Sequence, residues 1–134
     1  MEKEKVTIII ERSKDLFDAY SENCDGIYGA GDTIEECKAD ILTSIRQIKE
    51  KLPIEQWPEQ IKGEYEIEWK LDAQSFLDYF SDFISLAGME RITGVNQKQL
   101  SNYIHHRAQP RPKQVARIRE GLHRFAHELL SITL

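Results

Sequence analysis

Four short stretches in the first 72 residues have the hydrophobic and polar patterns typical of strands. The first stretch, Val6–Arg12, is rich in β-branched residues, which favour extended backbone. In the last, Tyr65, Ile67 and Trp69 alternate with charged residues, a pattern typical of a strand with one exposed face. Lys14-Asp15 marks a hairpin turn, and the glycines of the third stretch stand where a Cβ may not fit. The pattern predicts strands at residues 6–12, 16–21, 26–31 and 65–71.

Between the third and fourth predicted strands, apolar residues recur every three or four positions, as on one face of a helix. Asp32 or Thr33 is the expected cap, two glutamates follow in the first turn, and Pro53 ends the helix. Cys37 falls on the apolar face, so we expect a small buried hydrophobe rather than a reactive thiol. The predicted apolar face comprises Ile34, Cys37, Ile41, Leu42, Ile45, Ile48 and Leu52.

From Asp72 onward the spacing of apolar residues is helical. Asp72 is the expected cap of a first helix whose apolar face holds Phe76, Leu77, Phe80, Phe83 and Ile84. Pro112 suits the first turn of a last helix. In that helix Val115, Ile118, Leu122, Phe125 and Leu129 form a stripe that either closes the helical core or forms a dimer seam. The sequence leaves both alternatives open.

The stretch Met89–Ile104 predicts two short helices joined by a tight turn. Gly94 can end the first helix in the left-handed conformation, Val95 is an apolar plug, and Asn96 can cap the second helix. Leu100 and Ile104 then share a buried stripe. This is the pattern of a helix-turn-helix, whose second helix lies in the major groove of DNA. The alternative is an ordinary antiparallel helix pair.

The polar face of the second helix supplies the candidate DNA contacts. Glutamine pairs with adenine and lysine donates to guanine, so this face can read base edges. Arginines and lysines near the motif would contact phosphates, which position the helix without reading sequence. The predicted base contacts are Gln97, Lys98, Ser101 and Asn102, and the predicted phosphate contacts are Arg91, Arg107, Arg111 and Lys113.

Charge divides the chain in the same place. Residues 1–72 hold 10 Lys/Arg against 18 Asp/Glu, a net of −8, whereas residues 73–134 hold 8 against 5, a net of +3. All four histidines also lie in the second part. The overall charge of −5 would argue against binding to nucleic acid. Residues 73–134 are basic, however, so charge favours nucleic-acid binding by this part of the chain.

Composition narrows the class of protein further. Hydrophobic residues make up 40% of the chain, which suffices for packed cores. The sequence contains no run of about 18 apolar residues, so it predicts no membrane span. The first residues lack the apolar core of a signal peptide, and Cys24 and Cys37 form no metal-type cluster. We therefore expect a cytoplasmic protein with reduced thiols and no cofactor.

The segment Tyr28–Ile41, in which a strand leads into a G-D-T-x-E-E helix start, resembles the HicB antitoxin family. The order β-β-β-α-β is similar to that family's partial RNase H-like domain, and the C-terminal helix-turn-helix is similar to one of its DNA-binding attachments. The resemblance covers nearly the whole chain. Two departures stand out. The loop Glu22–Gly26 lacks the family's common proline-rich form. Glu90 replaces the alanine usual four residues before the turn glycine, so its side chain must point outward or change the helix crossing.

The resemblance implies an α+β antitoxin with a toxin-binding domain at 1–72 and a helix-turn-helix domain at 73–134. It would block a small, mRNA-cleaving HicA-like toxin and repress its own operon by binding operator DNA as a homodimer or higher oligomer. A basic toxin suits the acidic residues 1–72. The alternative is a stand-alone helix-turn-helix regulator whose N-terminal domain senses a ligand or dimerises.

A nuclease is the third hypothesis. It would need carboxylates that hold metal ions, and the candidates are Asp15, Asp18, Asp25 and Asp32. Asp15 falls in a predicted turn and Asp32 in a predicted cap, so we expect no catalysis. His123 and His127 have a spacing that can hold zinc, but no further ligand stands at a fitting offset. His105 and His106 follow the second helix of the motif and could touch phosphates, although exposure to solvent is the simpler expectation.

Overall fold

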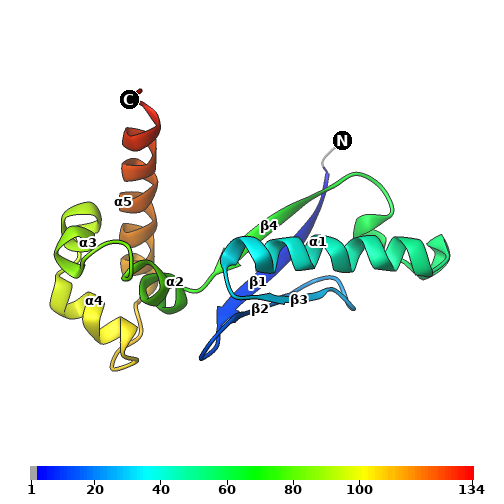
Figure 1. Cartoon of the computed structure of the whole chain (residues 1–134), viewed down its shortest axis with the longest axis horizontal. Coiled ribbons are helices and arrows are strands. Elements are labelled where there is room, and N and C mark those ends of the chain that lie inside the picture. The colour runs from blue at the N-terminus through cyan, green and yellow to red at the C-terminus, as the bar shows by residue number, and fades with distance from the viewer. Residues whose placement is uncertain (1–2) are drawn as a thin grey trace. The chain divides into compact units, whose positions relative to one another are not determined.

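The computed structural model describes residues 3–134 and shows a mixed α+β protein with one four-stranded sheet and five α-helices (Figure 1). The chain divides into two compact units, residues Met1–Asp72 and Ala73–Leu134. We call them unit 1 and unit 2 and describe each by itself.

The sheet of unit 1 has the strand order β3-β2-β1-β4. The strands are β1 (Glu4–Arg12), β2 (Phe17–Ser21), β3 (Tyr28–Gly31) and β4 (Tyr65–Leu71). The first three form an antiparallel meander, and β4 lies beside β1 in parallel. A parallel neighbour requires a long crossover, and helix α1 (Ile34–Lys51) supplies it.

Helix α1 begins at the predicted site. The Thr33 hydroxyl accepts the Glu36 N–H at 3.0 Å, and the Glu36 carboxylate accepts the Asp32 N–H at 2.9 Å. One donor that the helix leaves open and the N–H of the residue before the cap are thus both satisfied, and Thr33 is confirmed as the cap. The helix ends at Lys51, and Leu52 before Pro53 is extended.

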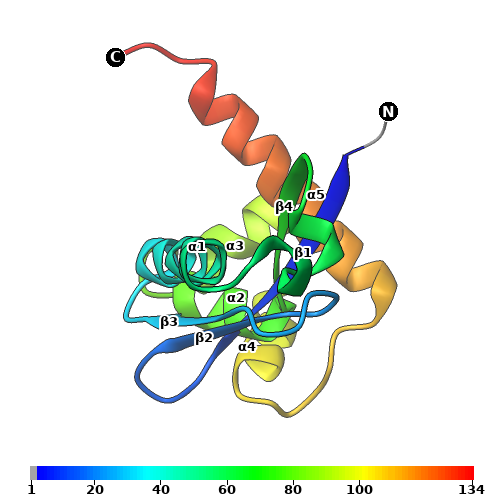
Figure 2. The same ribbon diagram turned by 90° about the vertical axis from the view of Figure 1, so that its right-hand side faces the viewer.

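Helix α1 packs on one face of the sheet, over β2 and β3 (Figure 2, in which α1 is seen end-on). The approach is close at β3. A Cβ on Gly31 would lie 2.6 Å from the Cys37 backbone nitrogen, and one on Gly29 would lie 2.9 Å from the Ile41 nitrogen. The expectation that a Cβ does not fit is confirmed at Gly29 and Gly31, but at Gly26, which precedes the observed strand, no atom lies within 4 Å of a Cβ.

The core of unit 1 lies between α1 and the alternate residues of the strands. Cys37, Ile41 and Ile45 face it from the helix and are buried as predicted. The short 3₁₀ turn Glu59–Ile61 adds the fully buried Ile61, in a segment that the sequence assigns only to a loop.

The prediction that two leucines, Leu42 and Leu52, belong to the buried face of the helix is wrong. Leu42 is 50% exposed and Leu52 is 40% exposed. Leu42 follows the buried Ile41 by one residue, which turns it about 100° away from the core face. Leu52 is the residue after the helix, so helical periodicity no longer sets its direction.

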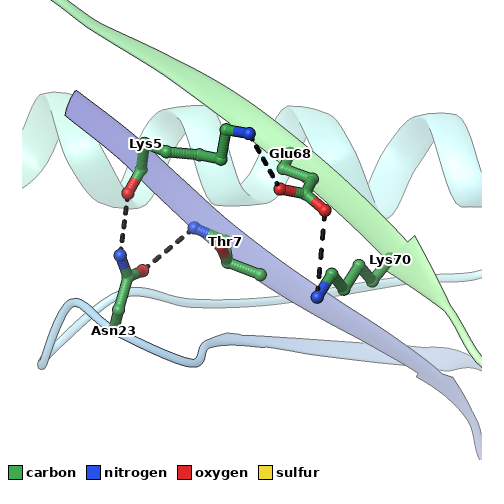
Figure 3. A network of polar contacts seen from close by, with 5 residues as sticks. All are labelled: Lys5, Thr7, Asn23, Glu68 and Lys70. Atoms are coloured by element: carbon green, nitrogen blue, oxygen red, sulfur yellow. Dashed lines mark hydrogen bonds and ion pairs between the residues drawn. The ribbon is translucent and has the colours of Figure 1, made fainter. Parts of the chain in front are cut away.

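The loop after β2 is tied to β1 by the side chain of Asn23 (Figure 3). Its Oδ1 accepts the Thr7 N–H at 2.9 Å, and its Nδ2 donates to the Lys5 carbonyl at 2.7 Å. The amide thus replaces a strand backbone where β2 has ended. Across β1, the Glu68 carboxylate lies 3.4 Å from the Lys5 ammonium and 3.8 Å from that of Lys70.

Unit 2 is helical. Its helices are α2 (Ala73–Phe80), α3 (Leu86–Thr93), α4 (Gln97–Ile104) and α5 (Pro112–Leu130). They share one core, formed by the buried residues Leu77, Met89, Val95, Leu100, Tyr103 and Ile118.

The predicted first helix of unit 2 is too long. Helix α2 ends at Phe80, the chain turns there, and the Ser85 hydroxyl caps α3 by accepting the Gly88 N–H. Ile84 still packs against the core, but Phe83 is 69% exposed because it lies in the turn rather than on a helical face.

In the described part of the chain, residues 3–134, no helix is both long enough and apolar enough to cross a membrane.

Candidate nucleic-acid interface

The turn between α3 and α4 has the local structure that the sequence predicts. Gly94 adopts a left-handed conformation with φ of 75°, and its N–H donates to the Glu90 carbonyl. Val95 is buried beneath the turn. The Asn96 side chain accepts the Lys98 N–H at 2.8 Å, which confirms Asn96 as the cap of α4. Leu100 is fully buried and Ile104 half-buried, so both lie toward the core.

The four predicted base-contact residues share one face of α4. Gln97 and Lys98 are exposed, and Ser101 and Asn102 one turn later are half-buried. Leu100 and Tyr103 occupy the opposite face and are buried. The polar face of α4 therefore remains accessible while its apolar face holds the helix in place.

Arg107, a predicted phosphate contact, lies against two of these residues. Its Nε donates to Asn102 Oδ1 at 3.1 Å, and its Nη2 donates to Ser101 Oγ at 3.4 Å. The His105 ring also contacts Ser101, since its Nδ1 lies 2.9 Å from the Ser101 carbonyl oxygen. Arg107 thus adds its positive charge to the polar face of α4.

The other predicted phosphate contacts lie on neighbouring elements, and all are exposed. Arg91 is in the last turn of α3, Arg111 is the cap residue of α5, and Lys113 is in the first turn of α5. In residues 73–134, all of which the structure describes, no Lys or Arg forms an ion pair with a carboxylate. These cations remain available to an anionic partner.

The helix starts in the two units have opposite charge. Helix α1 has Glu35 and Glu36 in its first turn, where their negative charges offset the positive end of the helix dipole. Helices α4 and α5 have no acidic residue in the first turn, and Lys98 and Lys113 stand there instead. Positive potential is therefore reinforced at the start of α5, which favours phosphate, whereas at the start of α4 Lys98 stands near the carboxylate of Glu90.

Glu90, which departs from the alanine usual in such motifs, has a structural role. Its Oε1 accepts the Gln97 N–H at 2.9 Å. The carboxylate is half-buried and caps the start of α4 from α3, so it neither points freely outward nor leaves a backbone donor open. Sequence reasoning missed this contact because Glu90 and Gln97 meet only across the turn.

Helix α5 braces the turn from behind. A Cβ on Gly121 would lie 2.7 Å from the Thr93 Cα and closer still to the Ile92 carbonyl oxygen. Arg117, one turn earlier on α5, donates through Nη2 to the Gly94 carbonyl at 2.6 Å. Neither residue was predicted. The one available signal was a glycine beside the apolar stripe of a long helix, between Ile118 and Leu122.

The remaining candidates do not come together into a site. Among the described residues, no group of three or more His, Cys, Asp or Glu could hold a metal ion. His105, His106, His123 and His127 are all exposed. Both cysteines are buried and free, and burial raises the pKa of the Cys24 and Cys37 thiols.

Comparison of the chain with protein-family models, with characterised proteins and with solved structures gives no match. The geometry and charge of the chain therefore carry the functional argument.

Replacing Gly121 with Ala should destabilise unit 2 by about 1–3 kcal/mol, because the added methyl group meets backbone atoms of α3 that cannot rotate away. Thermal unfolding followed by far-UV circular dichroism measures the change. Gly63→Ala is the control, since a Cβ there would meet no atom within 4 Å. Equal melting temperatures for Gly121→Ala and wild type would show that α3 and α5 are not in close contact.

Proposed function

We propose that unit 2 is a helix-turn-helix domain that binds duplex DNA through the polar face of α4. The observation that carries this proposal is the face formed by Gln97, Lys98, Ser101 and Asn102, exposed or half-exposed on a helix whose other face is buried. It lies on a short helix capped by Asn96 and Glu90, a support that fits insertion into a groove.

In this proposal the side chains have separate tasks. Gln97 and Asn102 hydrogen-bond to adenine edges, Lys98 donates to guanine, and Ser101 contacts either. Arg91, Arg107, Arg111 and Lys113 contact phosphates, and each releases counterions from the DNA on binding. The absence of carboxylate partners for these cations in residues 73–134 supports this role.

Replacing Gln97 or Asn102 with Ala should weaken binding to DNA from the chain's own promoter by about 1–3 kcal/mol per lost base contact. Gel-shift titration at fixed salt measures the dissociation constant. Gln47→Ala, which removes an exposed glutamine from α1, is the matched control. Wild-type affinity in both α4 variants would refute the assignment of α4 as the recognition helix.

We further propose that the protein binds its operator as a homodimer, or a higher oligomer, joined by the end of α5. The apolar stripe of α5 is covered only in part: Ile118 is 4% exposed, whereas Leu129 is 58% and Leu130 is 84% exposed. The buried Ile118 fits core closure, and we propose the dimer seam for the exposed end of the helix. A second copy would cover the exposed half, and two-fold symmetry suits a palindromic operator.

The double substitution Leu129→Ser and Leu130→Ser should shift the protein to monomers, because the apolar surface offered to a second copy is lost. Size-exclusion chromatography with light scattering measures the mass. Leu42→Ser is the control, since Leu42 is an exposed leucine on a helix of unit 1. A wild-type protein that is monomeric at micromolar concentration would contradict the proposed seam.

For unit 1 we propose the partial RNase H-like domain of a HicB-type antitoxin, which neutralises a small basic HicA-like toxin by direct binding. Its net charge of −8 supports this, since opposite charge speeds association with a protein that handles RNA. We propose a binding domain rather than a nuclease. Asp15, Asp25 and Asp32 lie in loops and Asp18 on a strand, and the four belong to no metal-type cluster among the described residues.

The product of a short basic reading frame adjacent to this gene should arrest cell growth when it is expressed alone. Co-expression of this chain should restore growth. The two proteins should also co-purify through an affinity tag on one of them. Growth arrest that this chain does not relieve, together with no co-purification, would remove the antitoxin assignment and leave the DNA-binding proposal standing.

One observation favours the alternative, a stand-alone helix-turn-helix regulator with a ligand-sensing N-terminal domain. Unit 1 has an open groove of about 510 Å³ between the loop after β2, the end of α1 and the segment that follows it. Trp57 and Ile48 offer apolar surface there, and the exposed Asp25 and Gln56 offer polar groups. Mass spectrometry of small molecules released from the denatured protein would identify a bound ligand.

A further inference from the structure

The sheet of unit 1 has a second face, opposite the helix α1. Side chains alternate between the faces of a strand, so residues beside the buried Val6, Ile8 and Ile10 of β1 point to the other side. No α-helix of unit 1 packs on that side among the described residues. We call it the open face.

A row of four residues crosses the open face, one from each strand. Tyr28 of β3 is paired with Tyr20 of β2, Tyr20 with Ile9 of β1, and Ile9 with Lys70 of β4. Tyr28 is 68% exposed and Tyr20 is 38% exposed, while Ile9 is half-buried between the strands on either side. In this row the two middle strands therefore carry Tyr20 and Ile9, and the edge strand β3 adds the exposed ring of Tyr28.

Carboxylates lie on both sides of this row. The next row toward the β1–β2 turn pairs Asp18 with Glu11. On the other side, Glu66 and Glu68 of β4 stand beside Lys5 and Thr7, and Glu68 is already paired with Lys5 and Lys70. The Tyr20 hydroxyl donates to Glu11 at 3.4 Å, and the charge of Glu11 raises the pKa of Tyr20.

The charges on the open face discriminate between possible occupants. Nucleic acid would meet Glu11, Asp18 and Glu66 as like charges. A second copy that joined face to face would bring the same carboxylates together. A cationic protein is attracted to this face in two ways. Its arginines and lysines pair with the carboxylates, and they also stack on the tyrosine rings.

We propose that the open face, centred on Tyr20 and Tyr28 and rimmed by Glu11 and Asp18, is the docking surface for a small basic protein. This inference rests on the proposed antitoxin function and specifies where that function resides. The aromatic row would form the dry centre of the interface, and the carboxylates would form its charged rim.

Titration of full-length variants with the purified product of the adjacent basic reading frame, by isothermal calorimetry, tests the inference. Tyr28→Ala and Asp18→Lys should each raise the dissociation constant about tenfold or more, as expected when a central anchor or a rim charge is lost. Glu35→Lys and Glu50→Lys are matched controls, because both alter exposed carboxylates on α1, and each should change binding less than about threefold.

The outcomes separate the two levels of the proposal. If wild-type protein does not bind the neighbouring product, the antitoxin function fails, and the docking surface fails with it. If wild type binds and the open-face variants bind equally well, the function stands and the docking surface is wrong. A far-UV circular dichroism spectrum and a melting temperature equal to wild type show that a variant is folded, and Asp18→Asn replaces Asp18→Lys if the reversal disrupts folding.

A third outcome identifies a different occupant. Unchanged binding of the neighbouring protein, with promoter affinity raised in Asp18→Lys but not in the charge-matched Glu35→Lys and Glu50→Lys, would mean that the open face holds the basic residues 73–134 of the same chain. That result would overturn the docking proposal, since the carboxylates would then compete with DNA rather than recruit a basic protein.

Discussion

The close contact between α3 and α5 is the constraint on which unit 2 depends. At Gly121 the two helices approach so nearly that no side chain fits between them. One turn away, Arg117 bonds to the carbonyl of the turn glycine. Together these contacts fix where α3 ends, and therefore the direction in which α4 leaves. A recognition helix must be placed with sub-ångström accuracy to match base edges, so rigid support from behind is a requirement of the proposed function.

The turn itself is stabilised by groups on both of its sides. Asn96 caps α4 from within the turn, and Glu90 caps it from the preceding helix. Glu90 also places a negative charge near a face proposed to bind phosphate. That charge is half-buried and hydrogen-bonded to backbone, so it acts on the helix start at short range, while exposed Lys98 and Arg107 dominate the surface.

In unit 1 the comparable constraint is the approach of α1 to β3. Gly29 and Gly31 allow the helix to lie almost against the strand backbone. All of the helical cover is thereby placed on one side of the sheet, and the other side keeps its tyrosines and carboxylates exposed. The edge of β3 is also protected, since Asp40 of α1 accepts the Ala30 N–H at 2.9 Å. A partner would therefore meet a face of the sheet more readily than this edge.

Local chemistry in the sequence determined the strands, the caps at Thr33 and Asn96, the left-handed Gly94 and the segregation of charge along the chain. Each of these depends on residues within a few positions of one another, so a pattern in one stretch suffices. The tertiary structure alone decided the rest. Glu90 meets Gln97, Arg117 meets Gly94 and Tyr28 meets Tyr20 only because the chain turns back on itself. The exposure of Leu42 and Phe83 likewise depends on which side of an element is covered, and hydrophobicity along one helix or turn does not carry that information.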